Sequence, residues 1–182
     1  MKATATSARG RVHYVTGDAT APDRSGPVVI AHVCNDLGRW GRGFVMALSK
    51  RWPEPRERFV AWHESGASGE EGPFELGRVQ FVRVEPDLWV ANVIGQHGLT
   101  AKKGVAPVRY DAICTGLTDV ARFAAGHRAT VHMPRIACGL AGGTWDKVEP
   151  LIADTLLAAG VETFVYDLPG KRTGRPQDRG QK

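Results

Sequence analysis

The sequence has little of what marks secreted, zinc-stabilised or membrane-spanning proteins. Its 3 cysteines are an odd number without a Cys-x-x-Cys pair, so we expect neither a disulfide framework nor a cysteine zinc site. No run approaches the roughly 20 apolar residues that span a membrane, and the first ten residues lack the apolar core of a signal peptide. The sequence therefore predicts a soluble cytoplasmic chain with no metal, no cofactor and no membrane contact. Five histidines without metal-ligand spacing are interpreted as structural or surface side chains: His13, His32, His63, His127 and His132.

Length and charge limit the domain organisation. The 182 residues, 42% of them hydrophobic, fit one domain with a core of ordinary size and would be cramped as two. Of the formal net charge of +5, +4 lies in residues 170–182, which carry Lys171, Arg172, Arg175, Arg179 and Lys182 against Asp178. This segment has no apolar period and is predicted to be a basic disordered tail, or alternatively a weak contact for nucleic acid or acidic protein. Residues 1–10 are predicted to be flexible, which leaves residues 11–169 as the domain.

Short β-branched runs alternate with helical patterns across this domain. We predict strands at residues 11–16, 28–34, 78–85, 88–94, 129–136 and 161–168. We predict helices at residues 43–52, 54–65, 109–125 and 145–159, the third stopping at Gly126 and the fourth at Gly160. The dipeptide "PD" between the third and fourth strands favours a hairpin. This alternation indicates an α/β fold of three α/β/α layers around a mixed central sheet of about six strands.

Two glycine-bearing loops each follow a predicted strand and precede a predicted helix. One reads "NDLGRWGRGF" and the other, "ACGLAGG", spans residues 137–143. In an open α/β sheet, ligands bind outside the carboxyl ends of the strands, where small residues and helix N-termini suit a diphosphate. Neither loop is a P-loop or a G-x-G-x-x-G fingerprint. The loops predict a phosphate-bearing ligand held mainly by backbone, unless they serve only as tight turns.

Four segments around these loops carry a family resemblance. They read "GDAT", "IAHVCNDLGRWGRGFVMAL", "HMPRIACGLAGGTWDKVEPLI" and "VYDLP". From Val12 to Pro169 the chain resembles the macrodomain family, an ADP-ribose-binding fold. It is most similar to the subgroup with the terminal ADP-ribose protein glycohydrolase, the DNA ADP-ribosyl glycohydrolase antitoxins and the macrodomain of the remodeller amplified in liver cancer. The resemblance implies a single macrodomain as the fold and ADP-ribose as the ligand.

The resemblance also implies roles for individual residues. Asp18 matches the aspartate that accepts a hydrogen bond from the adenine amine, although Asp18 alone would read as a turn residue. Ala19 matches a backbone contact to adenine, and Tyr166 and Leu168 end the last strand near the adenine pocket unless they are core residues. Two sets of residues match the phosphate loops of the family: Gly41, Arg42, Gly43 and Phe44 in the first, and Ala137, Cys138, Gly139, Leu140, Ala141, Gly142 and Gly143 in the second. Trp40, beside the first loop, is predicted to wall the ligand cleft, unless it only packs at the start of the helix.

The end of the site that should hold the distal ribose departs from the glycohydrolase pattern. Gln96 and Ala141 stand where that enzyme carries a lysine and an aspartate, so a covalent lysine mechanism is not expected. Gln96 is predicted to orient a water and His97 to act as a base, beside Asn35 near the ribose. Alternatively, these side chains only hold ribose hydroxyls or loop backbone, and Asn35 is an ordinary turn former.

The resemblance leaves three functions to weigh. We predict a hydrolase that releases ADP-ribose from ester-linked Glu or Asp of modified proteins through a positioned water. The alternatives are a non-catalytic reader of ADP-ribose or poly-ADP-ribose, and a phosphatase acting on ADP-ribose 1″-phosphate. The expected partners are ADP-ribose and a mono-ADP-ribosylated protein or nucleic acid, with the chain itself a monomer. Lys102 and Lys103 lie in a loop that reads as flexible and are interpreted as surface lysines.

Overall fold

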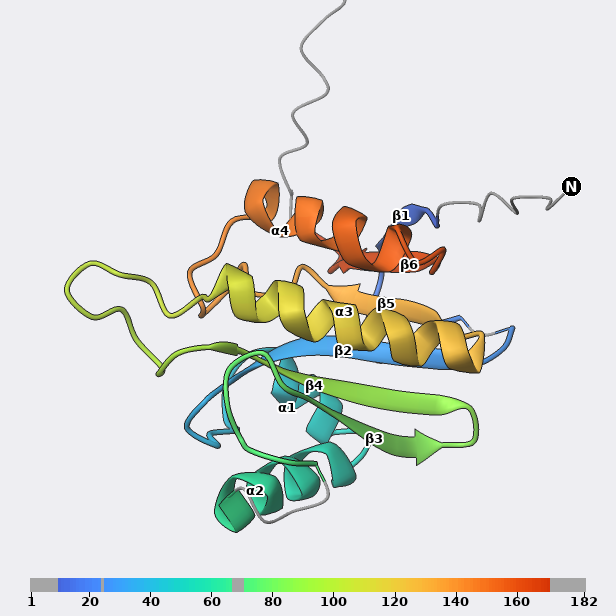
Figure 1. Cartoon of the computed structure of the whole chain (residues 1–182). Helices are drawn as coiled ribbons and strands as arrows, with labels where there is room; N and C mark the ends of the chain where they lie inside the picture. The colour runs from blue at the N-terminus through green and yellow to red at the C-terminus, as the bar shows by residue number, and fades with distance from the viewer. Residues whose placement is uncertain (1–9, 24, 67–70, 171–182) are drawn as a thin grey trace, which may run out of the picture.

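A six-stranded mixed sheet forms the centre of the molecule (Figure 1). The computed structural model describes residues 10–23, 25–66 and 71–170, so most of the two predicted terminal segments lies outside the described residues. The sheet order is β1-β6-β5-β2-β4-β3, with β3 antiparallel to β4 and the other described pairs parallel. The predicted α/β fold with a mixed six-strand sheet is confirmed. The strands are β1 (Val12–Thr16), β2 (Val28–Asn35), β3 (Val79–Glu85), β4 (Leu88–Gln96), β5 (Thr130–Pro134) and β6 (Thr163–Asp167).

Helices cover both faces of the sheet (Figure 1). One face carries α1 (Phe44–Ser49) and α2 (Glu54–Ser65), and the other carries α3 (Tyr110–His127) and α4 (Trp145–Ile152). The central strand β2 serves both cores because its side chains alternate: Val29 packs into the core beneath α3, whereas Ile30 packs with Leu48 of α1. It is buried along most of its length, as expected for a parallel strand covered on both sides. No helix in the described part of the chain combines the length and the apolar character needed to cross a membrane.

Three helix ends differ from the sequence prediction: α1 ends at Ser49, three residues before its predicted end, and the ends of the third and fourth helices also differ. α3 continues through Gly126 to His127, and Arg128 follows it with a left-handed φ of 52°. The Ala129 N–H donates to the Ala124 carbonyl at 2.8 Å, so a Schellman-type closure ends this helix later than the glycine indicates. The fourth predicted helix is α-helical only to Ile152 and continues as a π-helical segment, Ala153–Leu157. Gly126 therefore does not stop its helix, because a different residue forms the cap, whereas Gly160, with φ of 76°, closes the fourth helical segment: the Val161 N–H donates to the Leu156 carbonyl at 2.9 Å.

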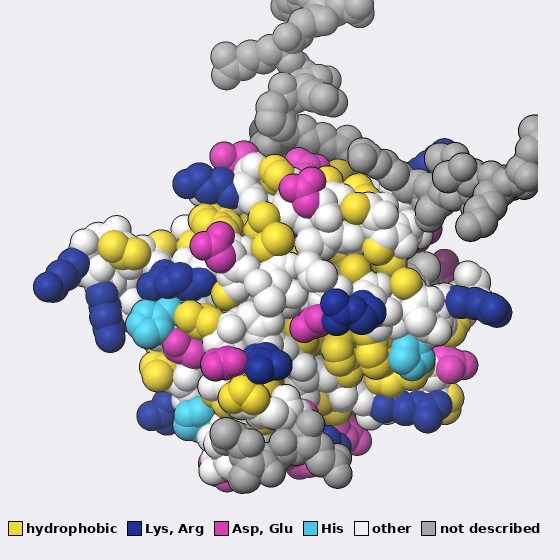
Figure 2. Space-filling model, in the orientation of Figure 1, with side chains coloured by type: hydrophobic (Ala, Val, Ile, Leu, Met, Phe, Trp, Pro, Cys, Tyr) yellow, Lys and Arg dark blue, Asp and Glu magenta, His cyan; other side chains and the backbone are white. Residues whose placement is uncertain are grey.

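Five parallel strands end at one edge of the sheet, and the chain leaves two neighbouring strands in opposite directions. It turns from β2 toward α1 on one face and from β5 toward α4 on the other (Figure 1). Such a change of direction is the topological switch point at which open α/β sheets bind ligands. β4 also runs two residues further than predicted, to Gln96, which pairs with Asn35 of β2 across a bulge. The segment between β4 and α3 projects from the body (Figure 1) and carries basic side chains at its tip (Figure 2).

Candidate functional site

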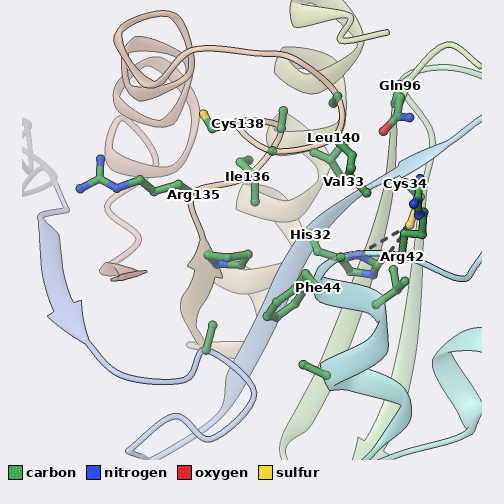
Figure 3. Close-up of a pocket in the computed structure, with 18 of the residues that line it drawn as sticks. His32, Val33, Cys34, Arg42, Phe44, Gln96, Arg135, Ile136, Cys138 and Leu140 are labelled. Atoms are coloured by element: carbon green, nitrogen blue, oxygen red, sulfur yellow. Dashed lines mark hydrogen bonds between the residues drawn. The ribbon is translucent and has the colours of Figure 1, made fainter. Parts of the chain in front are cut away.

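A cleft of about 990 Å³ crosses the carboxyl edge of the sheet. It runs from Gly17 after β1, past Tyr166 and the loop after β5, to the loop after β2 and Gln96 of β4. Figure 3 shows the part of the cleft between Arg135 and Gln96. β1 and β4 are separated by four strand spacings, which correspond to about 19 Å at roughly 4.8 Å each. The cleft is therefore long enough for an extended ligand with a different group recognised at each end.

The cleft brings most of the sequence-predicted site residues together. Three of the predicted site residues do not line the cleft: His97, Gly142 and Gly143. The residues that do are Asp18, Ala19, Asn35, Trp40, Gly41, Arg42, Gly43, Phe44, Gln96, Ala137, Cys138, Gly139, Leu140, Ala141, Tyr166 and Leu168.

The loop after β2 is shaped by the side chain of Asn35. Its Nδ2 donates to the Arg39 carbonyl at 2.7 Å, and its Oδ1 accepts the N–H groups of Leu37 and Arg39, each at 3.0 Å. Backbone groups of the loop therefore bond both the amide nitrogen and the amide oxygen of Asn35, a residue that is only 9% exposed. Trp40 lines the cleft, and its Nε1 donates to the Ser49 hydroxyl at 2.8 Å, which fixes the ring. These contacts favour the interpretation of Asn35 as the residue that positions the loop.

The loop after β5 closes on itself behind the cleft. The Gly143 N–H donates to the Ala137 carbonyl at 2.8 Å, and a Cβ on Gly143 would lie 2.6 Å from that oxygen. Gly142, with φ of 71°, donates to the Gly139 carbonyl at 3.0 Å and backs onto Ala106. Sequence reasoning placed both glycines against the ligand, whereas the structure gives them the role of folding the loop. Their own N–H groups are already bonded, so they are not free for a phosphate.

The two loops meet across the middle of the cleft. Gly43 has φ of 79° and ψ of −145°, a region open essentially to glycine, and a Cβ there would lie 3.5 Å from Leu140 Cδ1. The hydrogen bonds found among the described residues use none of the N–H groups of Gly41, Gly43, Gly139 or Leu140. Exposed N–H groups on opposing loops form an anion site, because each lacks an internal acceptor. The arrangement can hold a phosphate or diphosphate by backbone, as the loop sequences predict.

The β1 and β6 end of the cleft is held by two carboxylates. Asp18 Oδ1 accepts the N–H and the hydroxyl of Thr20, both at 2.8 Å, so this oxygen is engaged in the turn while Oδ2 retains lone pairs for another donor. Asp167 makes a bidentate pair with Arg135, at 2.6 and 2.8 Å. The bond to Asp167 raises the pKa of the Arg135 guanidinium, which also lies over the Trp145 ring. Sequence reasoning missed this pair, which joins the ends of β5 and β6.

One buried histidine bonds Tyr166, and another lies in the floor of the cleft. The Tyr166 hydroxyl bonds His132 Nδ1 at 2.9 Å, and Tyr166 itself is 9% exposed, so it is both a lining residue and part of the core. His32 lies in the floor with Nε2 2.6 Å from Asn92 Oδ1 (Figure 3). Burial lowers the pKa of each imidazole to about 4, so both are neutral near pH 7. Sequence reasoning correctly interpreted them as structural, but only the fold places His32 at the cleft.

At the β4 end, Asp36 connects two loops. Its Oδ1 accepts the Gly98 N–H at 2.8 Å, and its Oδ2 lies 2.6 Å from His97 Nδ1. Partial burial tends to raise the pKa of Asp36, but the bonds from Gly98 and His97 outweigh it and hold that pKa below its ordinary value. Gln96 Nε2 in turn donates to the Gly98 carbonyl at 2.9 Å. His97 therefore faces Asp36, not Asn35, and its half-exposed ring lies outside the cleft lining.

Comparison with known proteins agrees with this architecture. No family model matches the chain. The structure of a macrodomain protein from Streptomyces coelicolor is 57% identical in sequence with a TM-score of 0.75, over 86% of this chain and 99% of that one. The chain belongs to the macrodomain family.

Two further comparisons cover less than half of the compared protein, which limits what the similarity shows. Chromodomain-helicase-DNA-binding protein 1-like of Danio rerio is 31% identical over 165 residues, which is 85% of this chain but 15% of that relative's length. The Thermosipho africanus DarTG structure in complex with ADP-ribose has a TM-score of 0.58 at 19% identity, over 80% of this chain and 39% of that one. At that identity the second comparison shows the fold alone. The described residues contain no group of three or more His, Cys, Asp or Glu side chains placed to hold a metal ion.

Proposed function

We propose that this macrodomain binds ADP-ribose along the cleft and releases it from ester-linked Glu or Asp of modified proteins. The pair of loops that meet at Gly43 and Leu140, with unbonded N–H groups on both sides, is the observation that carries the binding step. A diphosphate fits there because backbone N–H groups and the guanidinium of Arg42 supply donors without a metal. Adenine then lies toward Asp18 and the distal ribose toward Gln96, the two ends of the cleft.

Gln96 is the polar side chain of this chain best placed to orient a water at the ribose. Its Nε2 is committed to the Gly98 carbonyl, and Figure 3 shows its amide oxygen on the side of the cleft. In the proposed step, a water held by that oxygen attacks the anomeric carbon of the distal ribose and the bond to the ester oxygen breaks. The carboxylate leaves with the bonding electrons, and a diphosphate oxygen takes the proton of the water. A glutamine amide is a poor nucleophile, so no enzyme–ribose bond forms.

His97 enters this scheme as a positioning residue. In the structure, Asp36 holds its imidazole outside the cleft lining. The prediction that His97 acts as a general base requires the ring to leave Asp36 and turn toward the ribose. While it stays on Asp36, His97 supports the Gly98 turn to which the Gln96 amide is bonded.

A non-catalytic reader of ADP-ribose is the second candidate function. It is favoured by Gln96 and Ala141 at the positions where the glycohydrolase carries its lysine and aspartate, and by the placement of His97 away from the cleft. Both candidates share the ligand and differ only in turnover. The phosphatase alternative shares it as well, with a 1″-phosphate in place of the carboxylate ester.

One set of assays separates the three candidates. Calorimetry should show ADP-ribose binding in the micromolar range, near −8 kcal/mol, with adenosine much weaker because the loops stay empty. The protein is then incubated with glutamate-linked mono-ADP-ribosylated protein and, separately, with ADP-ribose 1″-phosphate. Release of ADP-ribose from the protein supports the hydrolase, binding without release shows a reader, and release of inorganic phosphate alone shows a phosphatase. Equal affinity for adenosine and ADP-ribose would refute the role of the loops.

A further inference from the structure

The segment between β4 and α3, which sequence reasoning interpreted as flexible, forms a tight hairpin. Lys102 and Val105 exchange two backbone bonds, at 3.1 and 2.9 Å. Between them, Lys103 with φ of 51° and Gly104 with φ of 78° make a two-residue turn of the kind that joins hairpin strands. We call residues 99–106 the lysine hairpin. Its conformation is defined by backbone bonds, so its two lysines are held next to each other at the tip.

The base of the lysine hairpin is part of the cleft. Leu99 and Thr100 line the cleft at the Gln96 end. The return arm is pinned to the loop after β5, because the Val108 N–H donates to the Ala141 carbonyl at 2.9 Å. The tip projects outward beyond the body of the molecule (Figure 1). It stands beside the mouth of the cleft, where whatever is attached to the distal ribose must leave.

Positive charge is concentrated around this mouth. Residues 11–169 contain 17 basic and 18 acidic side chains, yet the three segments that form the rim, 36–43, 97–108 and 135–144, contain 5 basic and 1 acidic. The acidic one, Asp36, is bonded to His97 and Gly98, and Arg135 is paired with Asp167. The rim therefore stands out as basic in a domain that is otherwise slightly acidic.

Of the four other basic side chains of the rim, Arg39 and Arg42 line the cleft, whereas Lys102 and Lys103 lie outside its lining. No ion pair found among the described residues involves them, and all four residues are exposed: Arg39, Arg42, Lys102 and Lys103. Figure 2 shows dark-blue side chains at the tip of the lysine hairpin, standing clear of the body. Neither Lys102 nor Lys103 lines the cleft, and the loops already offer donors for the diphosphate, so neither lysine is assigned to ADP-ribose itself.

We propose that the lysine hairpin binds carboxylates of an acidic peptide segment that flanks the ADP-ribosylated Glu or Asp. This inference rests on the proposed function, since it places the carrier at the ribose end of the cleft. A peptide fits better than a nucleic-acid strand because the hairpin offers no Phe, Tyr or Trp on which a base could stack. It instead sets the exposed Leu99 and Val105, 46% and 59% accessible, beside the lysines, a mixture suited to peptide side chains.

The test compares charge reversal at the hairpin with a matched reversal elsewhere. The hairpin variant is Lys102→Glu with Lys103→Glu. The control is Lys50→Glu with Arg128→Glu, which changes the net charge equally at exposed sites outside the cleft lining, and Arg128 has φ of 52°, close to that of Lys103. Both variants compete for fluorescent ADP-ribose against free ADP-ribose and two peptides that carry ADP-ribose through a hydrolysis-resistant bond. One peptide has Glu and Asp flanks and the other has Gln and Asn flanks.

The hairpin variant should lose about 2- to 30-fold in affinity for the acidic peptide at low salt, the usual range for two exposed ion pairs. Its affinities for the neutral peptide and for free ADP-ribose should stay at the parent values, and the loss should shrink at high salt. Equal loss in the control, or none in the hairpin variant, would overturn the proposal. An ADP-ribosylated oligonucleotide that binds more tightly than the acidic peptide, with the same lysine dependence, would overturn it in favour of nucleic acid. If the parent fails to bind free ADP-ribose, the proposed function itself falls, and the hairpin proposal with it.

Discussion

Replacing Asp36 by alanine tests whether one carboxylate holds the Gln96 end of the cleft in place. The Gly98 residue is buried and its N–H has Asp36 as its acceptor, at 2.8 Å. Leaving a buried N–H without a partner costs about 1–3 kcal/mol. The contact with the half-exposed His97 adds at most about 1 kcal/mol, because water screens it. Asp36→Ala should therefore lower the free energy of unfolding by about 1–4 kcal/mol, whereas Asp36→Asn, which can still accept the Gly98 N–H, should lose less.

The pH dependence of the same variants has a defined sign. The pKa of Asp36 is lower in the folded protein than its ordinary value of 3.8, so its charge stabilises the fold above the unfolded pKa. That contribution should be constant from neutral pH down to about pH 5 and fade as the pH drops below about 4 toward the folded value. Urea unfolding of the parent and of Asp36→Asn across this range measures the difference. Identical midpoints for the parent and Asp36→Ala at pH 7, or a gap that grows on acidification, would refute the reasoning.

Three further substitutions test the rest of the cleft. Asp18→Ala should weaken ADP-ribose by about 1.5–3 kcal/mol in calorimetry, the usual worth of a hydrogen bond to a charged group, and an unchanged affinity would mean that adenine lies elsewhere. Gly43→Val should reduce ADP-ribose binding at least tenfold with the fold retained by circular dichroism. Its φ of 79° strains any side chain, and a branched one would displace the first loop where it contacts Leu140; normal binding would remove Gly43 from the phosphate site. Gln96→Ala should lower release of ADP-ribose from glutamate esters by about 10²-fold while binding changes little, and borohydride should trap no adduct in the parent. A trapped adduct would establish a covalent mechanism instead.

The sequence predicts the features that depend on local pattern. Alternating β-branched runs locate the strands, and the spacing of small residues marks both loops before the sheet order is known. The family resemblance adds the order of residues along the cleft, and most of the residues it names do line it. These predictions succeed because each is encoded within about ten consecutive residues.

Most of the sequence predictions that the structure corrects depend on contacts between segments distant in the chain. His97 and Asp36 are 61 positions apart, and nothing in either neighbourhood shows that they bond. Gly142 and Gly143 lie in the right loop but on its reverse side, because the loop curls until Gly143 meets the Ala137 carbonyl. For the lysine hairpin a local signal was present: glycine after Lys103 suits a turn with two left-handed residues. The charged side chains of Lys102 and Lys103 favoured the interpretation of a flexible loop instead, since charged loops are commonly mobile.

Asn35 and Asp36, neighbours at the end of β2, give the first loop a mechanical link to the ribose end of the cleft. Asn35 shapes the loop by bonding Leu37 and Arg39, while Asp36 reaches across to Gly98, whose carbonyl holds the Gln96 amide. The first loop and the Gly98 turn that fixes Gln96 are thus joined through two adjacent residues. In the hydrolase that we propose, Asp36→Ala is expected to lower turnover more than ADP-ribose binding, because the first loop keeps its Asn35 bonds while the Gln96 amide loses the support of the Gly98 turn.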